Sequence, residues 1–328
     1  MRRAALILLL LCGSTQGAYQ PLEMFTIKWG DAPEQLRISR PTINDPNTPA
    51  DSSDDYIEPG GGPSEIFVDD NENLIVRSYE FAQLKGFDKS GTYLFSLLPP
   101  ERTPGGDICA GHPSSMYVDA AFNIYLISDP PLSYVPVVDY QGNLGDRLYP
   151  FNDSSEAIAG LCWPTFDRIV FFARSGNEVT YLNGVFQRGG TCALLRQDGY
   201  YYSAMLENDS SLIFFRSQVH DMANRSATSE SLVISFPEDT IYSVDLLPGG
   251  DEAFIYIFIM KWSYPSKPAY HGVWCFDLAF NRIDEVELAP PMAPYSHFIR
   301  PFIARDGSIY EFRCQDDGLH VLKWTKEQ

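Results

Sequence analysis

The sequence has few positive charges for its size. Its 328 residues carry 24 Lys and Arg against 43 Asp and Glu, a formal net charge of −19. Because nucleic-acid binding neutralises phosphates with a surplus of Lys and Arg, this balance argues against a general nucleic-acid-binding protein. It also argues against electrostatic docking on anionic lipid. No stretch reaches the roughly 18 apolar residues that a spanning helix needs, so no transmembrane segment is predicted.

Residues and motifs that carry chemistry are also scarce. There are 6 Cys and 5 His, and no cysteine pair has the spacing of zinc ligands. The motifs Gly-x-Ser-x-Gly and His-Glu-x-x-His and a phosphate-binding glycine loop are missing. The sequence therefore predicts no cofactor, and it favours a binding protein over an enzyme without deciding between them.

The first 18 residues have the layout of a secretory signal peptide. A basic start at Arg2 and Arg3 is followed by an apolar run over 4–12 and a small, polar stretch over 13–18. Cleavage after Gly17 or Ala18 is expected, which leaves a single secreted or periplasmic domain over 19–328. Lipoprotein anchoring at Cys12 is not expected, because a bulky Leu precedes that cysteine. An exported chain permits disulfides, and five cysteines remain: Cys109, Cys162, Cys192, Cys275 and Cys314.

An internal repeat is the main organising feature. Two segments, beginning at Gly61 and Gly111, share the skeleton G-x-P-S-x-x-x-V-D-x-x-x-N-[LI]-[IY], and each continues to an apolar-Asp-x-x-Gly turn. Repeats of this period indicate stacked supersecondary units. The first unit is expected to contain four short strands, at about 65–68, 74–77, 84–87 and 93–97, because turn residues separate runs of β-branched and aromatic residues there.

Fainter copies follow, with second strands expected at 168–172, 211–215, 253–257 and 308–312. The average spacing of about 47 residues predicts an all-β fold: a six-bladed β-propeller of four-stranded antiparallel blades. The last unit has only three strands. An N-terminal strand at 24–29 or 35–39 is therefore expected to close the ring, since an open sheet edge is a hazard. Residues 44–62, rich in Asp, Pro, Ser and Gly, are expected to form a mobile loop.

The repeat resembles that of the six-bladed NHL/TolB-like β-propellers. The resemblance is carried by P-S-x-x-x-V-D-x-x-x-N-[LI]-[IY] and F-D-x-x-G, over 61–97 and 111–148, and partly over 303–324. Repeats of that family usually have a turn glycine before the Asn, where this chain has Glu72 and Phe122; only the last unit keeps it, as Gly307. The resemblance implies the architecture. It does not imply one activity, because the superfamily includes binding scaffolds, sugar- and lactone-acting enzymes, lyases and interaction modules.

Basic and imidazole side chains recur at one end of the predicted blades. In a propeller, the ends of second strands and the starts of first strands share one face, formed by the loops between second and third strands and between blades. We expect a mildly cationic mouth over the central channel on this face, and Asp-rich turns on the opposite face. The predicted ligand-binding residues are Arg77, His112, Arg174, Arg216, His297 and Arg313.

The leading hypothesis is a monomeric secreted propeller that binds a protein, a peptide or a small anionic or sugar-like ligand through this face. Two alternatives stay open. One is a hydrolase or lyase with a divalent metal in the channel, for which Glu65, His112 and Asp129 are the nearest ligands. The other is a structural repeat domain of an envelope assembly, in which the arginines pair with acids such as Asp129 and Glu311.

Overall fold

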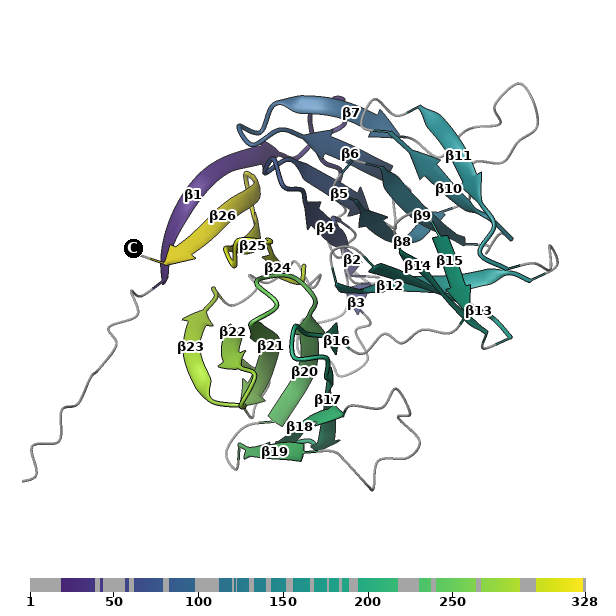
Figure 1. Cartoon of the computed structure of the whole chain (residues 1–328). Coiled ribbons are helices and arrows are strands. Elements are labelled where there is room, and N and C mark those ends of the chain that lie inside the picture. Colours follow the sequence, from purple (N-terminus) through teal and green to yellow (C-terminus); the bar gives the residue numbers. More distant parts are fainter. Residues whose placement is uncertain are drawn as a thin grey trace, which may run out of the picture.

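The computed structural model is an all-β propeller of six four-stranded antiparallel sheets, arranged as blades around an axis (Figure 1). It describes residues 19–38, the short strands 42–43 and 57–58, and residues 62–326 apart from 79–82, 98–111, 120, 122, 130–132, 140–142, 152–155, 166–167, 176, 183–184, 189–193, 218–229, 237–239, 264–266 and 290–298. Among these residues, no helix has the length and hydrophobicity needed to cross a membrane. The predicted signal peptide and most of the predicted mobile loop lie outside them.

Five blades are built from four consecutive strands each. Blade 1 comprises β4 (Glu65–Val68), β5 (Leu74–Ser78), β6 (Gln83–Phe87) and β7 (Tyr93–Leu97). Blade 2 comprises β8 (His112–Val118), β9 (Ile124–Asp129), β10 (Val135–Val138) and β11 (Leu144–Leu148). Blade 3 comprises β12 (Ile158–Thr165), β13 (Arg168–Ala173), β14 (Glu178–Leu182) and β15 (Val185–Arg188). Blade 4 comprises β16 (Leu194–Leu195), β17 (Tyr201–Asn208), β18 (Ser211–Ser217) and β19 (Glu230–Ser235). Blade 5 comprises β20 (Thr240–Leu247), β21 (Phe254–Ser263), β22 (Lys267–Asp277) and β23 (Arg282–Glu287).

Blade 6 joins the two ends of the chain, as predicted. Its strands are β24 (Phe302–Ile303), β25 (Ile309–Gln315), β26 (Gly318–Lys326) and, outermost, β1 (Tyr19–Lys28). The antiparallel ladder of β1 and β26 runs from the pair Tyr19–Lys326 to the pair Lys28–Gly318, and Figure 1 shows the purple and yellow strands side by side. The N-terminal closing strand is thus confirmed, and it is the first of the two expected candidates.

The second candidate, 35–39, serves another purpose. Leu36 forms a parallel bridge with Trp29 and is buried. The buried ammonium of Lys85 in β6 donates to the carbonyl oxygen of Gln35, and burial lowers the pKa of Lys85. This segment is therefore fastened to blade 1 rather than added to a sheet. Further along, β2 (Thr42–Ile43) and β3 (Ile57–Glu58) pair as a separate two-stranded ladder.

A histidine clasp ties β1 to the rest of blade 6. Nδ1 of His320 lies 2.9 Å from Oε1 of Glu23 in β1, and Nε2 lies 2.8 Å from Oδ1 of Asp317 in the β25–β26 turn. Carboxylates accept hydrogen bonds, so both ring nitrogens must carry a proton to donate to them. Burial lowers the pKa of His320, but the bonds to Asp317 and Glu23 outweigh it and raise that pKa above its usual value.

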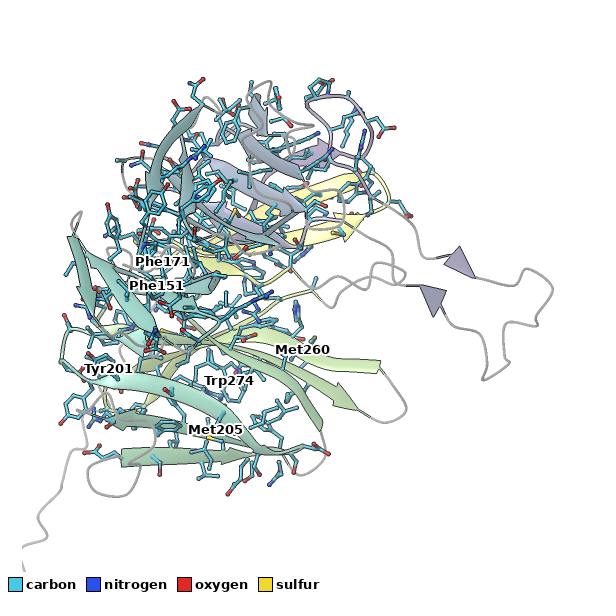
Figure 2. All side chains as sticks on the ribbon, turned by 90° about the vertical axis from the view of Figure 1, so that its right-hand side faces the viewer. Phe151, Phe171, Tyr201, Met205, Met260 and Trp274 are labelled. Carbon is cyan, nitrogen blue, oxygen red and sulfur yellow. The ribbon has the colours of Figure 1, made fainter. Side chains whose placement is uncertain are left out.

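The sheets are held together by apolar layers between the blades. In β21 every residue from Ile255 to Met260 is buried. Alternate side chains point to opposite faces of a strand, so Phe258 and Met260 join the cluster toward blade 6, whereas Ile257 and Ile259 join Trp274 in the cluster toward blade 4. Figure 2 shows Met260 and Trp274 on either side of this sheet. The continuous apolar run of β21 is thus the signature of a strand covered on both faces.

One hairpin turn recurs and explains the V-D-x-x-x-N part of the repeat. Oδ1 of Asp69 accepts hydrogen bonds from the backbone N–H of Asn71 and Asn73, and Nδ2 of Asn73 donates to Oδ2. The same contact between an Asp and the Asn four residues later recurs at Asp119, Asp139 and Asp277. Glu72, in the glycine position of the resembling family, has φ 64°. The acidic residues in these turns thus close hairpins.

Blade 4 differs from the expectation. Its first strand, β16, has only two residues, and a turn at Asp198 and Gly199 follows it. Gly199 has φ 78° and donates to the carbonyl of Arg196, as Gly307 does to Ala304 in blade 6. The segment predicted as second strand, 211–215, therefore belongs to the third strand, β18.

The cysteines divide into two groups. Cys162 is disulfide-bonded, whereas Cys275 and Cys314 are free thiols. The partner of Cys162 therefore lies outside the described residues, as Cys109 and Cys192 do. Burial raises the pKa of both free thiols to about 12, so neither is an activated nucleophile.

Candidate functional site

The alternating strand directions define two faces of the ring. The loop face carries the ends of the second strands and the starts of the first strands, and the turn face carries the hairpins at Asp69 and Asp277. Arg77 and Arg313 lie within two residues of the ends of β5 and β25, and Arg174 directly follows β13, so all three are toward the loop face as expected. His112 begins β8 on the same face, but its side chain is outside the described part of the structure, as is the whole of His297.

Arg216 lies on the opposite face, contrary to the expectation. It stands near the end of β18, and because β18 is a third strand rather than a second one, that end reaches the turn face. Its contacts agree, since its Nη1 donates to the carbonyl of Leu278 in the β22–β23 turn of blade 5. The sequence signal for this placement was the Asp198–Gly199 turn, which marks the start of the true second strand.

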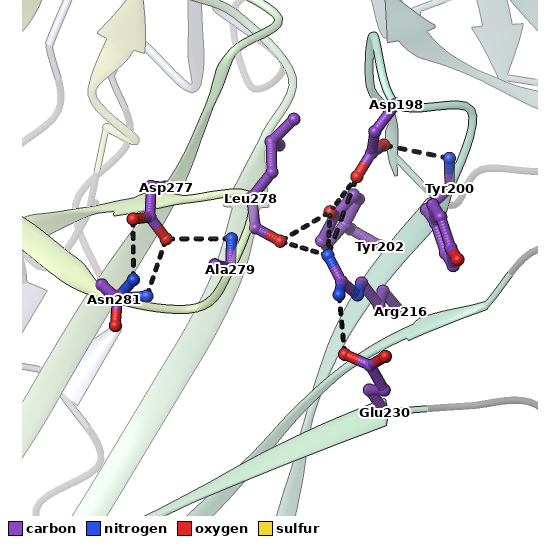
Figure 3. Close-up of polar contacts among 9 residues, drawn as sticks. All are labelled: Asp198, Tyr200, Tyr202, Arg216, Glu230, Asp277, Leu278, Ala279 and Asn281. Atoms are coloured by element: carbon purple, nitrogen blue, oxygen red, sulfur yellow. Dashed lines mark hydrogen bonds and ion pairs between the residues drawn. The ribbon is translucent and has the colours of Figure 1, made fainter.

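Arg216 is held by groups of two blades (Figure 3). Nη2 lies 2.6 Å from Oε2 of Glu230, and the guanidinium stacks 4.9 Å from the ring centre of Tyr200. Tyr202 donates its hydroxyl to Asp198 at 2.7 Å, and burial raises the pKa of Tyr202 to about 12. With the Leu278 carbonyl bound as well, Arg216 fastens blade 4 to blade 5 and has its charge balanced by acids of its own blade.

Two loop-face arginines are also paired with carboxylates. Nε of Arg77 lies 2.9 Å from Oε2 of Glu65. Arg313 makes a bidentate pair with Glu311, at 2.8 and 2.9 Å. The buried Glu311 further accepts from the backbone N–H of Ala289 and from Nε1 of Trp324. These contacts match the alternative in which arginines pair with neighbouring acids, Glu311 among them. Arg174 is exposed.

Aromatic rings pack at the axis beneath this face. Phe67 of β4 lies 4.8 Å from Phe302 of β24 and 5.8 Å from Tyr117 of β8, measured between ring centres. All three are buried and come from the first strands of three adjacent blades. Because side chains two residues apart share a face of a strand, Glu65 stands above Phe67 on the side of the loop face. Arg300 lies two residues before Phe302, just outside β24.

The charged groups above these rings form the candidate site, which consists of Glu65, Asp245 and Arg300. Nε of Arg300 lies 3.2 Å from Oδ2 of Asp245 in β20, and 68% of the Arg300 side chain is exposed. A third of the Glu65 side chain is exposed, and a quarter of that of Asp245. Burial raises the pKa of Glu65, and Arg77 and, more weakly, Arg300 oppose that rise. The site therefore joins blades 1, 5 and 6 through opposite charges.

Arg300 is the functional candidate that the sequence analysis missed. The arginines predicted from the sequence were those expected at the ends of second strands, whereas Arg300 lies two residues before the first strand of blade 6. In the sequence, Arg300 and Glu65 share one feature: each lies two residues before a phenylalanine of a first strand. Of the three predicted metal ligands, only Glu65 has a described side chain, and the described residues contain no cluster of three His, Cys, Asp or Glu suited to a metal ion.

The chain matches no protein-family model and no curated protein sequence. Among solved structures it is similar to an inactive variant of virginiamycin B lyase from Staphylococcus aureus with quinupristin, at 11% identity and a TM-score of 0.43, over 89% of this chain and 100% of that one. A streptogramin B lyase is 10% identical, with a TM-score of 0.42, over 91% of this chain and 100% of that one. A calcium-binding protein, regucalcin, from Agrobacterium tumefaciens is 10% identical, with a TM-score of 0.41, over 81% of this chain and 91% of that one. Likenesses this distant carry no argument about activity, and the NHL/TolB-like resemblance stays a prediction.

Proposed function

We propose that the protein is a secreted or periplasmic binding propeller, which takes a small ligand or a peptide end at the loop face, over Glu65, Asp245 and Arg300. Arg300 carries the proposal. It lies two residues before the innermost strand of blade 6, it is bound to Asp245 of blade 5 by one ion pair, and most of its side chain remains exposed. Placing charged groups close to an apolar interior costs free energy, whereas apolar side chains that only pack there would not. A few polar groups over an apolar base are typical of ligand sites.

Two further features support the location. The first 18 residues have the three parts of a signal peptide. Cys162 is disulfide-bonded, which suits an oxidising compartment outside the cytoplasm. Neither feature bears on which ligand is bound.

The binding proposal is tested by thermal denaturation of the purified protein with acidic sugars, small carboxylates, amino acids and short peptides. A ligand at 100 times its Kd stabilises the folded state by about 2.7 kcal/mol, which raises the melting temperature measurably. We expect at least one ligand to raise it for the wild type and to lose this effect in Arg300→Ala.

Arg305→Ala is the matched control. Arg305 belongs to the same blade and makes a similar ion pair, with its Nε 3.3 Å from Oδ1 of Asp70, but on the turn face. The Arg305→Ala variant should bind ligand as the wild type does. If no ligand of the panel shifts the wild-type melting temperature, or if both variants lose the shift equally, the loop-face site is wrong and the structural alternative gains.

A further inference from the structure

The charges near the candidate site cancel. Three acid–arginine pairs lie on the loop face of blades 5, 6 and 1: Asp245 with Arg300, Glu311 with Arg313, and Glu65 with Arg77. Their formal sum is zero in a chain whose net charge is −19. These three pairs therefore contribute no net charge to the loop face. Alternating charges without a net charge favour a ligand that is itself dipolar.

Among the described residues, the pair of Asp245 and Arg300 leaves hydrogen-bonding groups of both partners unused. Asp245 uses one oxygen, Oδ2, for Nε of Arg300 and for the hydroxyl of Ser243 at 3.3 Å. A carboxylate has two oxygens, so Oδ1 remains as an acceptor. Arg300 contributes Nε to this pair, and its two Nη groups form a planar fork suited to a carboxylate. An acceptor for a cation and a donor fork for an anion thus lie side by side.

Singly charged ligands fit this arrangement less well. A lone anion approaches against the field of a strongly acidic protein. A lone cation meets the three guanidinium groups of the paired arginines. A molecule that carries an ammonium and a carboxylate on neighbouring atoms satisfies Asp245 and Arg300 together and brings no net charge.

We propose that the site binds a small zwitterion of the α-amino acid type, with its carboxylate on the Nη fork of Arg300 and its ammonium on Oδ1 of Asp245. This proposal rests on the proposed function, because it names the ligand class of the same loop-face site. The partly exposed carboxylate of Glu65 provides a second acceptor for the ammonium, from the neighbouring blade.

The test is calorimetric titration of the purified protein with L-leucine, L-glutamate, L-lysine and the dipeptide Gly-Leu. The strongest binder is then compared with its N-acetyl derivative and its methyl ester. A hydrogen bond to a charged group contributes about 1.5–3 kcal/mol, so blocking either end should weaken binding about tenfold or more. Asp245→Asn should weaken binding of the free ligand by a similar factor while leaving the affinity for the N-acetyl derivative unchanged. A merely structural role of Asp245 would not produce this difference. A dipeptide that binds best would place the ligand among peptide ends rather than free amino acids, still as a zwitterion.

Other outcomes overturn the inference and are distinguishable from failure of the proposed function. If the N-acetyl derivative binds as tightly as the free ligand and Arg300→Ala abolishes both, the site takes an anion and the zwitterion inference is wrong, while the binding function stands. The same holds if none of the four zwitterions binds but an acidic sugar does so through Arg300. If no ligand of either panel binds, both proposals fail. Arg305→Ala should behave as the wild type in every titration.

Discussion

The closing strand offers a matched pair of substitutions that tests how far the ring depends on β1. Ile27 and Leu22 lie on this one strand, opposite Leu319 and Lys323 of β26. Ile27 is 3% exposed and belongs to the main hydrophobic core, whereas Leu22 is 63% exposed. Replacing each by Ala removes a similar aliphatic group while the backbone pairing is kept. The difference between the two variants therefore measures burial on β1.

The expected magnitudes follow from this burial. Truncating a fully buried Ile to Ala costs about 2–5 kcal/mol, from lost transfer free energy and the cavity left behind. An exposed substitution usually changes stability by less than about 0.5 kcal/mol. Ile27→Ala should thus lower the midpoint of guanidinium-induced unfolding clearly, and Leu22→Ala should leave it near the wild-type value. Tryptophan fluorescence is a suitable probe, because Trp29 and Trp324 lie in or beside blade 6.

Equal midpoints for the two variants would contradict the reasoning, since they would show that β1 contributes no more from its buried side than from its exposed side. Deleting 19–40 provides the stronger perturbation. It removes Tyr19, Ile27 and Leu36 from the interior and leaves β26 as an open edge, so the loss should exceed that of Ile27→Ala. A deletion variant that unfolds like the parent would refute closure by β1.

Three further predictions concern other contacts. The His320 clasp should stabilise the fold fully below the unfolded-state pKa of about 6.5 and lose its effect as pH rises through the raised folded-state pKa. The difference in melting temperature between wild type and His320→Gln should therefore be larger at pH 6 than at pH 9. A constant difference would argue against the clasp. Gly307→Ala places a side chain at φ 82° and should lower stability by about 1–2 kcal/mol. Gly145→Ala, whose added Cβ meets only ordinary contacts, should be close to neutral in the same denaturation assay. Equal losses of stability would show that the positive φ is not responsible. Arg216→Met should lower stability by about 1–3 kcal/mol and leave any loop-face ligand affinity unchanged in titration, and a lost affinity would place the binding site on the turn face.

Much of the architecture could be predicted from the sequence because strand pattern and turn chemistry are local. In blade 1 the four expected strands agree with the observed ones to within a residue at each end. The Asp–Asn turns explain why: each hairpin is closed by side chains four residues apart, such as Asp69 and Asn73, so the signal is contained in a few consecutive letters. The missing fourth strand of the last unit likewise followed from counting.

The errors arose where the outcome depended on pairing between distant segments. The two-residue strand β16 carries too little pattern to be recognised alone, so the strands of blade 4 were shifted by one and Arg216 was assigned to the wrong face. The pairing of the loop-face arginines could not be predicted for a related reason. Composition shows the arginines, but Glu311 and Asp245 become their partners only through the packing of strands and blades. Arg300 was missed because its importance depends on its ion pair with Asp245 of a neighbouring blade.

The ladder between β1 and β26 has a consequence for how the protein is made. Its partners are the first and the last strands of the described chain, so no part of it can form on a ribosome until nearly the whole sequence has emerged. Contacts this distant in sequence form late and slowly. Until then β1 presents an unpaired strand edge, which invites pairing with other chains. A product cut short before β26 would keep this edge permanently. Soluble yield should therefore fall abruptly, rather than gradually, once C-terminal truncation enters β26.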